Sequence, residues 1–354
     1  METVLVTGGA GFVGSNLAIR LKQDFDNIRV IALDNLKRRG SELSISRLRE
    51  NGVEFLHGDI RNREDLDAVS PIDLILECSA EPSVLAGYGS SPEYVVQTNL
   101  MGTLNCLELA RKHDAGLIFF STSRVYPFNR INALRYIETD TRFVLNGEQS
   151  TPGVSSEGIA EGFPLDGSRS LYGATKLASE LILREYVDIY GLRAVVNRCG
   201  VIAGPWQFGR TDQGVVALWV AQHLLGGRLR YIGFGGSGKQ VRDVLSIDDL
   251  YRLLRLQIAK LASLRGETFN VGGGWRNSVS LMELTELCRT ETGRRIDIGR
   301  ELETRPADIR IYWTDHRKVT SMTGWAPQKG PREIVAEIAE WIRQHRNTLK
   351  AVLT

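Results

Sequence analysis

The sequence predicts an α/β protein built on a doubly wound parallel sheet of the Rossmann type, with a smaller α/β domain toward the C-terminus. Apolar runs of strand length alternate with helix-length segments that carry an apolar residue at every third or fourth position. A glycine-rich loop, Gly8–Gly14, directly follows the first run. Strands that are hydrophobic along their whole length are typical of a parallel sheet with both faces covered.

The expected strands of this sheet share continuous hydrophobicity. They are Thr3–Thr7, Ile28–Leu33, Val53–Leu56, Leu74–Leu76, Leu117–Phe120 and Leu192–Val196. The longest helices expected between them are Pro92–His113 and Leu171–Tyr190. The alternation loosens after residue 198, where we expect Val215–Leu225, Asp248–Leu261, Thr268–Val271, Ser280–Thr292 and Arg332–His345. The segment Pro127–Ser170 is too long for an ordinary connection, and loops of that length are usually functional or mobile.

Composition excludes several classes of protein. The 44 basic residues nearly balance 42 acidic ones, so no overall field attracts nucleic acid or an anionic membrane. No apolar run approaches the roughly 18 to 20 residues of a spanning helix. The four cysteines lie far apart without a CxxC pair, and we expect neither a disulfide framework nor a metal site. The chain enters its first strand without a signal-like segment, so we expect a cytoplasmic protein.

The glycine-rich loop is the first candidate binding site. Because glycines lack side chains, the backbone can approach a pyrophosphate, which the free N–H groups at the start of the next helix stabilise. Asp34 follows Gly14 by about 20 residues, at the end of the second strand, where a carboxylate can accept both ribose hydroxyls of NAD. The residues expected to bind NAD here are Gly8, Gly11, Phe12, Val13, Gly14, Asp34 and Asn35.

The choice between NAD and NADP depends on two opposed signals. Asp34 would repel a 2′-phosphate, which favours NAD. Lys37, Arg38 and Arg39 lie just beyond it and could bind that phosphate, or could form an ordinary solvated basic loop. We expect NAD.

The next two strand ends could also border the cofactor. Asp59 and Ile60 follow the third strand, where the adenine would lie, and Ser79 and Ala80 follow the fourth, where small residues permit close approach. Ordinary turn chemistry would explain either pair as well.

A candidate catalytic constellation combines Tyr172 and Lys176 with the hydroxyl cluster Ser121–Ser123. Residues four apart share a helix face, so the ammonium of Lys176 can lie near the phenol of Tyr172. A nearby ammonium favours the ionised phenol, whose pKa is ordinarily about 10. Tyr172 thereby becomes a plausible general base.

With these motifs the chain resembles the extended short-chain dehydrogenase/reductase family over nearly its whole length. Further motifs in that family's order are Asn99–Asn105, Ser121–Tyr126, Arg242–Val244, Arg305–Asp308 and Gly324–Pro327. The resemblance implies a catalytic triad of Thr122, Tyr172 and Lys176, and a cofactor contact from Asn99. It also implies that Arg242 and Arg305 hold the diphosphate of a nucleotide sugar, although each could instead be a structural ion-pair partner.

Within that family, the residues after the catalytic threonine differ with the reaction. Dehydratases and decarboxylases carry an acidic residue there, whereas this chain reads Thr122-Ser123-Arg124, and arginine cannot act as that carboxylate. The resemblance therefore favours epimerisation by transient oxidation to a ketosugar and reduction on the other face.

The chain bears a closer resemblance to epimerases that act at C2 of a CDP-linked dideoxyhexose. The similarity lies in Asp34–Leu36, Gly58–Asn62, Glu138–Arg142, Gln207-Phe208, Asp212–Gly214, Gly238–Leu245 and the insertion 127–170. By this resemblance, the substrate contacts are Glu81, Ser123, Gln207, Gln213, Arg242 and Arg305. Glu81 could instead be a capping carboxylate, and its loop departs from the epimerase pattern, which leaves the sugar open.

Other functions stay open at this point. The chain could be a nucleotide-sugar 4-epimerase, a net reductase, or a regulator that senses NAD without turnover. We expect residues 1–198 to bind NAD, with a return segment near 240–275, and residues 199–239 and 276–354 to bind the nucleotide sugar. The resemblance also implies a homodimer or homotetramer paired through the helices Pro92–His113 and Leu171–Tyr190.

Overall fold

The computed structural model describes residues 1–25, 27–210 and 213–353, and it divides into two compact units. Unit 1 comprises residues 1–125, 171–198 and 251–269, and unit 2 comprises residues 126–170, 199–250 and 270–354. These bounds differ from the expected domains. The insertion 127–170 belongs to unit 2, and only residues 251–269 of the expected return segment belong to unit 1, because backbone pairing and packing tie the other residues to unit 2.

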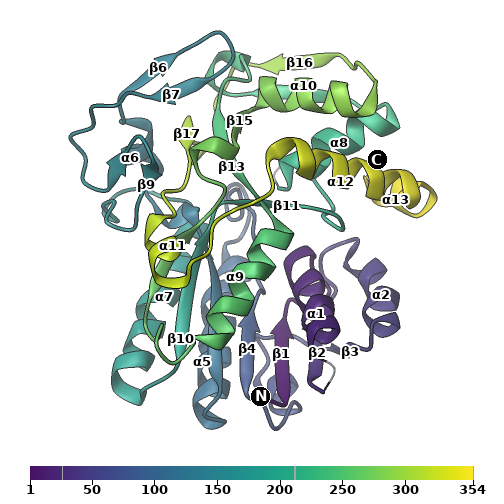
Figure 1. Cartoon of the computed structure of the whole chain (residues 1–354), viewed down its shortest axis with the longest axis vertical. Helices are drawn as coiled ribbons and strands as arrows, with labels where there is room; N and C mark the ends of the chain where they lie inside the picture. Colours follow the sequence, from purple (N-terminus) through teal and green to yellow (C-terminus); the bar gives the residue numbers. More distant parts are fainter. Residues whose placement is uncertain (26, 211–212, 354) are drawn as a thin grey trace. The chain divides into compact units, whose positions relative to one another are not determined.

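The central feature of unit 1 is the predicted parallel sheet (Figure 1). Its seven strands lie in the order β14 (Thr268–Val271), β10 (Ala194–Cys199), β5 (Gly116–Thr122), β4 (Leu74–Glu77), β1 (Thr3–Thr7), β2 (Arg29–Asp34) and β3 (Glu54–His57). The order reverses direction between β1 and β4. Ligands of doubly wound sheets bind at the carboxyl ends of the strands beside such a switch point.

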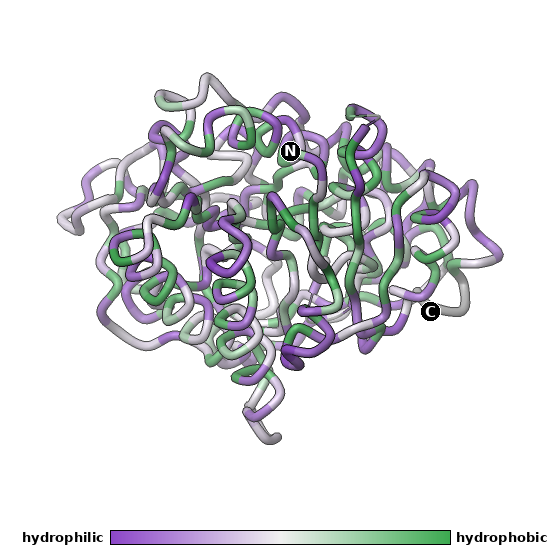
Figure 2. The backbone as a smooth tube through the Cα atoms, turned by 90° about the horizontal axis from the view of Figure 1, so that it is seen from below, coloured by the Kyte–Doolittle hydropathy of each residue, from purple (hydrophilic) through white to green (hydrophobic). Residues whose placement is uncertain are grey.

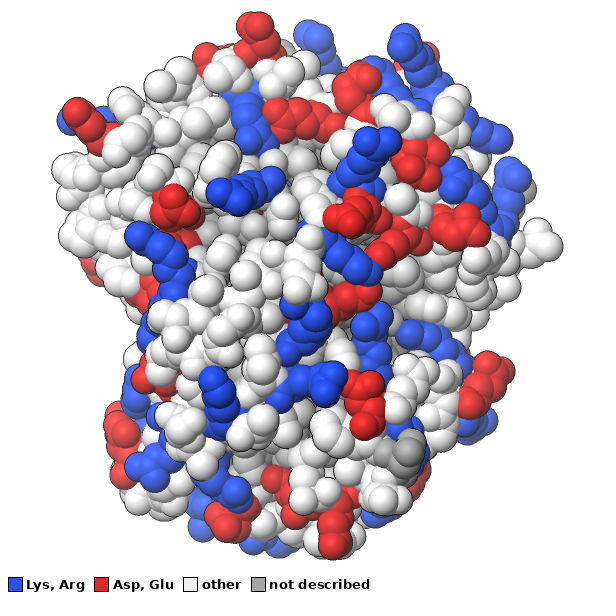
Figure 3. Space-filling view, viewed as in Figure 1, with Lys and Arg blue, Asp and Glu red and all other residues white. Residues whose placement is uncertain are grey.

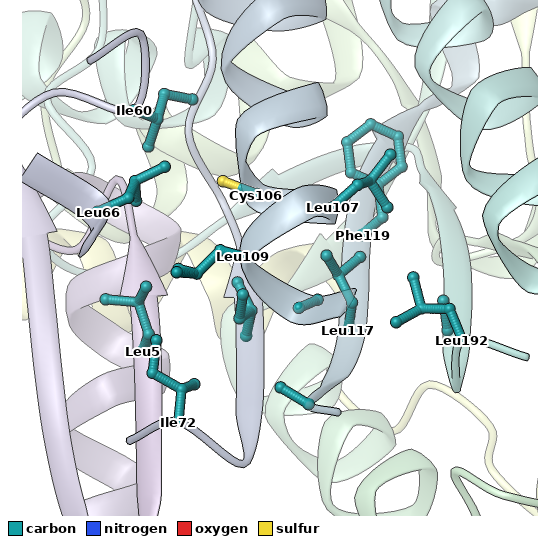
Figure 4. Packing of buried hydrophobic residues seen from close by; sticks show 14 of the residues in the cluster. Leu5, Ile60, Leu66, Ile72, Cys106, Leu107, Leu109, Leu117, Phe119 and Leu192 are labelled. Carbon is teal, nitrogen blue, oxygen red and sulfur yellow. The ribbon is translucent and has the colours of Figure 1, made fainter. Parts of the chain in front are cut away.

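Helices cover the sheet. They are α1 (Phe12–Asp24), α2 (Ser44–Glu50), α3 (Arg63–Asp67), α4 (Glu93–Val96), α5 (Gly102–Lys112), α7 (Leu171–Tyr190) and α9 (Ile247–Ala259). One face of the sheet forms a core cluster with α3, α5 and α7 (Figure 4). Leu5, Leu117 and Phe119 point from the strands, and Cys106 and Leu107 meet them from α5.

The helix expected over Pro92–His113 is interrupted. Between α4 and α5 the turn Gln97–Met101 is a π-helix. The carbonyl of Asn99 accepts hydrogen bonds from the hydroxyls of Thr103 (2.8 Å) and Ser179 (2.9 Å). Such bulges change which side chains a helix directs inward, and they are frequent at functional sites.

Unit 2 contains smaller sheets and a group of packed helices. Strand β13 (Val241–Ser246) pairs with β11 (Val201–Ala203), β15 (Ser278–Ser280) and β17 (Ile311–Tyr312), and β12 (Leu229–Ile232) pairs with β16 (Ile298–Glu301). The helices are α8 (Val215–Leu225), α10 (Leu281–Thr292), α11 (Arg317–Thr323), α12 (Pro331–Gln344) and α13 (Arg346–Leu353). Ser280 and Glu283 form a capping box that fixes the start of α10.

The insertion 127–170 is ordered as short elements. They are α6 (Phe128–Asn132) and two hairpins, β6 (Tyr136–Glu138) with β7 (Phe143–Leu145) and β8 (Val154–Ser155) with β9 (Gly158–Ile159). Arg142 of the first hairpin donates hydrogen bonds to Glu283 (3.1 Å) and to the carbonyl of Ser278 (2.5 Å). These contacts attach the insertion to the remainder of unit 2.

Within the described residues, no helix is long and apolar enough to cross a membrane. Figure 2 agrees, because hydrophobic and hydrophilic residues alternate along the helices. On the face shown in Figure 3, basic and acidic side chains are intermixed.

Candidate functional site

The glycine-rich loop of unit 1 forms a cradle against the start of α1. Gly8 has a positive φ of 62°, and a Cβ on it would lie 2.9 Å from the carbonyl oxygen of Cys78. A Cβ on Gly14 would lie 2.2 Å from the carbonyl oxygen of Gly8, so only glycine allows the helix to start this close to the loop. Gly11 is the N-cap of α1 and provides no side-chain cap. The N–H groups of Phe12 and Val13 in the first turn are thereby left for a ligand.

The carboxylate of Asp34 closes this loop at the end of β2. It accepts hydrogen bonds from the backbone N–H groups of Ala10 (3.1 Å) and Leu36 (2.8 Å). Burial raises the pKa of Asp34, and these hydrogen bonds oppose the rise. The N–H of Gly11 contributes a third hydrogen bond. Three contacts do not exhaust the acceptor capacity of a carboxylate, so ribose hydroxyls could still be accepted.

Asn35 and Asp59 are brought together beside Asp34. The amide of Asn35 donates to Asp59 (2.8 Å), and Arg61 makes an ion pair with the same carboxylate (2.7 Å). Hydrogen bonds from Arg61 and Asn35 outweigh desolvation and lower the pKa of Asp59 to about 2. Ile60 points the other way, into the core, where a Cβ on Gly102 would strike it. A cofactor contact from Ile60 would therefore use its backbone.

The basic loop after Asp34 is partly engaged with an aromatic ring. The ammonium of Lys37 lies 4.4 Å from the ring centroid of Tyr94, and the guanidinium of Arg61 lies 4.9 Å from it. Cation–π contacts of this kind help to hold Lys37 and Arg61 against the aromatic ring.

Asn99 connects the end of β4 with α7. Its side chain accepts from the N–H of Glu81 (2.8 Å) and donates to the carbonyl of Glu81 (3.1 Å) and to Thr175 (3.3 Å). The position thus fixes the small-residue segment Ser79–Ala80 next to the helix that carries Tyr172. The Glu81 carboxylate accepts from the N–H of Ser83 (3.2 Å), a local turn contact of the capping kind.

The predicted triad residues lie on neighbouring elements of unit 1. Thr122 ends β5, is 7% exposed, and accepts a hydrogen bond from the N–H of Arg124 (3.2 Å). Ser123 follows it as the first residue of the 3-10 turn Ser123–Val125. Tyr172 and Lys176 lie one turn apart in the first part of α7. Tyr172 is partly exposed, whereas Lys176 is buried.

The ammonium of Lys176 has no hydrogen-bond partner among the described residues. It lies 4.3 Å from the ring centroid of Phe119 and 3.6 Å from the carboxylate of Glu77. A buried donor without an acceptor is rare in folded proteins and needs an explanation, such as a catalytic role. The glycine cradle and this buried ammonium, with donors available to a ligand, together fit a dinucleotide.

The other predicted substrate residues lie in unit 2. The guanidinium of Arg242 pairs with Asp308 (2.8 Å) and with the carbonyl of Ile309 (2.5 Å). Gln207 donates to the carbonyl of Ile202 (2.9 Å), and its oxygen is buried without a partner in the described chain. Gln213 exchanges backbone hydrogen bonds with Arg210 just before α8. Arg305 is partly exposed in the connection before β17.

Comparison with known proteins assigns the chain. The sequence profile of a family described as "NAD dependent epimerase/dehydratase family" matches residues 4–272. The chain belongs to this family. Membership confirms the predicted extended short-chain dehydrogenase/reductase fold, an enzyme, and NAD as the cofactor.

This epimerase/dehydratase is similar to proteins with different reactions. It is 34% identical to the CDP-paratose 2-epimerase of Salmonella typhi over 348 residues, 96% of this chain and 98% of the relative. It is 30% identical to a dTDP-glucose 4,6-dehydratase of Xanthomonas campestris over 365 residues, 100% of this chain and 96% of the relative. The UDP-glucose 4-epimerase of Thermotoga maritima, solved with UDP-glucose, superposes with a TM-score of 0.77 at 26% identity, over 98% of this chain and 100% of the other.

Sequence reasoning missed Glu77. It ends β4 inside an apolar run, and no motif around it indicates a role. The one available signal is an acidic residue in a strand expected to be buried on both faces, since charged side chains are almost never fully buried unless they are paired.

Proposed function

We propose that this protein is an NAD-dependent nucleotide-sugar epimerase that acts at C2 of a CDP-linked dideoxyhexose. The observation that carries the proposal is the buried ammonium of Lys176, one helical turn from Tyr172 on a helix that packs against β5, the strand that ends at Thr122. The choice of epimerisation rests on Arg124, which stands where a dehydratase would need an acid. The choice of substrate rests on the 34% identity with the CDP-paratose 2-epimerase.

The roles of the protein groups follow from their placement. NAD would supply reversible hydride exchange, so that the ring carbon can be oxidised and reduced again without net redox change. Tyr172 would take the proton of the sugar hydroxyl and later return it. Thr122 would orient that hydroxyl, and the ammonium of Lys176 would stabilise the phenolate and bind ribose hydroxyls.

Holding the cofactor would fall to the cradle and its neighbours. The residues proposed for this are Gly8, Gly11, Phe12, Val13, Gly14, Asp34, Asn35, Asp59, Ile60, Ser79, Ala80, Asn99 and Lys176. Helix N-termini and glycine loops suit a pyrophosphate. The side-chain amide of Asn99 is already hydrogen-bonded to Glu81 and Thr175, so its contribution would be to fix the shape of the site.

Holding the nucleotide sugar would fall to Glu81, Ser123, Gln207, Gln213, Arg242 and Arg305. A guanidinium presents a fork of donors that matches phosphate geometry. Arg242 already uses part of its fork on Asp308, which would orient the remaining donors. A firmly held diphosphate would let the oxidised sugar rotate, so that its opposite face meets the cofactor, without leaving the enzyme.

The test is to incubate the purified protein with CDP-paratose and to identify the sugar by NMR. We expect epimerisation at C2 with the deuterium label at that carbon retained, because the hydrogen leaves and returns on the same cofactor. Incorporation of solvent deuterium there would contradict the proposed mechanism. No turnover of CDP-, UDP- or GDP-linked sugars would contradict the assignment as an epimerase.

The variant Tyr172→Phe tests the general base. Loss of a positioned acid–base group lowers kcat by about 10²- to 10⁴-fold. The matched control is Tyr190→Phe on the same helix, because Tyr190 is 55% exposed and lies at the far end of α7. We expect the control to retain full activity. An active Tyr172→Phe variant would point to a regulator that only senses NAD.

A 4-epimerase is the second candidate, favoured by the similarity to the UDP-glucose 4-epimerase structure. Reaction of UDP-glucose but not CDP-paratose would identify it. Net consumption of NADH with a ketosugar would indicate a reductase.

We also propose a cytoplasmic enzyme that pairs through α5 and α7 into a dimer or tetramer. The support is apolar exposure on α7, where Leu181 is 63% and Ile189 is 65% exposed. Analytical ultracentrifugation of the protein and of Leu181→Glu would test the pairing.

A further inference from the structure

We propose that Glu77 is a positioning residue that holds the ammonium of Lys176 in the dry interior of unit 1 as its counter-charge. The inference rests on the proposed function for its effect on Tyr172, while the pairing itself can be tested separately.

The strand register places Glu77 under the helix. Glu77 is the last residue of β4, and its Cα partners are Thr7 on β1 and Phe119 on β5. Residues in register on neighbouring strands direct their side chains to the same face of a sheet. Phe119 and the α5 residue Cys106 belong to the core cluster on this face (Figure 4). Glu77 is therefore a carboxylate built into a hydrophobic layer, and it is 0% exposed.

Lys176 reaches this layer from α7. Its ammonium lies 3.6 Å from Oε2 of Glu77 and 4.3 Å from the centroid of the Phe119 ring. Lys176 is 1% exposed, so water does not solvate its charge. An unpaired buried ammonium is strongly unfavourable, and the carboxylate and the aromatic face both lower that cost.

The pair is held mainly by charge. The attraction between Glu77 and Lys176 is larger than the hydrogen-bond contributions that Lys176, the Ser79 backbone and Thr103 make to the carboxylate. The ammonium lies 3.6 Å from Oε2, longer than an ordinary hydrogen bond. The three donors of the ammonium thus remain available to acceptors on the opposite side, such as hydroxyls of a bound ribose. A salt bridge at ordinary hydrogen-bond length would engage one of those donors fully, so the 3.6 Å separation of this ion pair suits a positioning role.

The other groups around the pair do not supply a second charge. On α5, burial raises the pKa of the Cys106 thiol well above its usual range, which keeps it neutral. Thr103 on α5, Thr7 on β1 and Phe119 on β5 are uncharged. On α7, Glu180 is paired with Arg198 of β10 (2.7 Å).

The pKa of Glu77 is raised by burial, and the attraction of Lys176 opposes that rise. The two charges therefore sustain each other. When the carboxylate is replaced by an amide, the ammonium loses its compensation and either loses its proton or moves away. In both cases the phenol of Tyr172 loses the cation that favours its ionised form.

The experiment measures the ionisation of Tyr172 in the NAD-loaded protein, by the phenolate absorbance that disappears in Tyr172→Phe. We expect Glu77→Gln to move this titration, and the rising limb of kcat against pH, upward by about one pH unit, equivalent to tenfold. In the Lys176→Met background, Glu77→Gln should add no further shift. Glu77→Asp, which keeps the charge, should stay near the wild-type titration.

The matched control is Glu180→Gln, which alters a second buried acid of unit 1 that is paired with a base. It should lower stability without moving the titration. A downward shift in Glu77→Gln, or none, overturns the proposal, because a merely structural carboxylate would affect folding alone.

Urea unfolding tests the pairing of Glu77 with Lys176 independently of the enzyme reaction. The double variant Glu77→Gln/Lys176→Met should unfold at a higher urea concentration than Lys176→Met, because it removes the stranded carboxylate. An equal or lower midpoint would contradict the pairing even if Glu77→Gln does not fold. If no sugar is epimerised, the proposed reaction fails, but the phenolate titration and the urea midpoints still decide the role of Glu77.

Discussion

Two buried ion pairs involving α7 are built in opposite ways. The carboxylate of Glu180 accepts hydrogen bonds from Nη2 (2.7 Å) and Nε (3.0 Å) of Arg198 and from the hydroxyl of Ser121. Glu77 and Lys176 are more deeply buried, at 0% and 1% exposed against 7% and 6% for Glu180 and Arg198, but their charged atoms stand 3.6 Å apart, longer than an ordinary hydrogen bond. The first pair is saturated and connects α7 with β5 and β10. In the second pair, the N–H donors of the Lys176 ammonium remain available to a ligand near the carboxyl ends of the strands.

The difference separates stability from function within one helix. A saturated buried pair recovers part of its desolvation cost through directed hydrogen bonds, so it can serve as a structural joint. An unsaturated pair recovers less and is poorly explained by stability alone. We therefore expect the two pairs to respond differently to mutation.

Breaking the saturated pair should have the largest effect on stability. Arg198→Met leaves Glu180 buried without its cation, and removal of one partner of such a pair costs about 3–5 kcal/mol. Urea unfolding followed by circular dichroism measures it. The comparison fails if Arg198→Met costs no more than Lys176→Met at neutral pH.

Breaking the unsaturated pair should give a loss that depends on pH. In Lys176→Met the buried Glu77 remains, and its folded-state pKa is raised above the unfolded value of about 4.3. A raised carboxyl pKa stabilises the fold below the unfolded pKa, and this contribution is lost as pH rises. Relative to wild type, the loss should be near zero at pH 4.5 and reach about 2–3 kcal/mol at pH 8. A loss that is independent of pH would show that Glu77 is not the group left unpaired.

Replacing both residues of the unsaturated pair with apolar ones should increase the free energy of unfolding. Glu77→Met/Lys176→Met exchanges two buried charges for apolar groups of similar length, a change that is often neutral or stabilising by about 1–4 kcal/mol. We expect a gain near the lower end, about 1–2 kcal/mol, together with loss of activity. Melting curves and turnover on the same preparations give both results. A clear loss of stability would mean that the pair is a structural joint like its neighbour.

The contrast also shows what the sequence could and could not predict. The strands Thr3–Thr7 and Thr268–Val271 and the helix Leu171–Tyr190 occur with the predicted bounds, because each carries a complete local pattern. The helix expected over Pro92–His113 contains a π-turn, since the register around Asn99 depends on contacts with α7 that no local periodicity encodes. The two hairpins within residues 127–170 could not be predicted from the sequence either.

The residues of the candidate site likewise fall into those that local sequence spacing predicts and those that it does not. Gly8, Gly14, Asp34, Tyr172 and Lys176 were predicted because their chemistry depends on fixed local spacing. Glu77 could not be, because its relation to Lys176 arises from the pairing of β4 with β1 and β5 and from the packing of α7 over that face. Residues joined only by the tertiary fold leave no spacing in a single sequence.

The smallest expected effect concerns the hydroxyl that completes the saturated pair. Ser121→Ala removes one donor to Glu180 while Arg198 stays bound, so the loss should be about 1 kcal/mol, typical of one hydrogen bond. Ser121 adjoins Thr122, and a rigid β5 end should keep the titration of Tyr172 in place. Urea midpoints and the phenolate titration separate the two effects. If Ser121→Ala shifts the titration as far as Glu77→Gln does, the saturated pair also tunes the phenol, and the division between a structural and a functional pair on α7 would have to be abandoned.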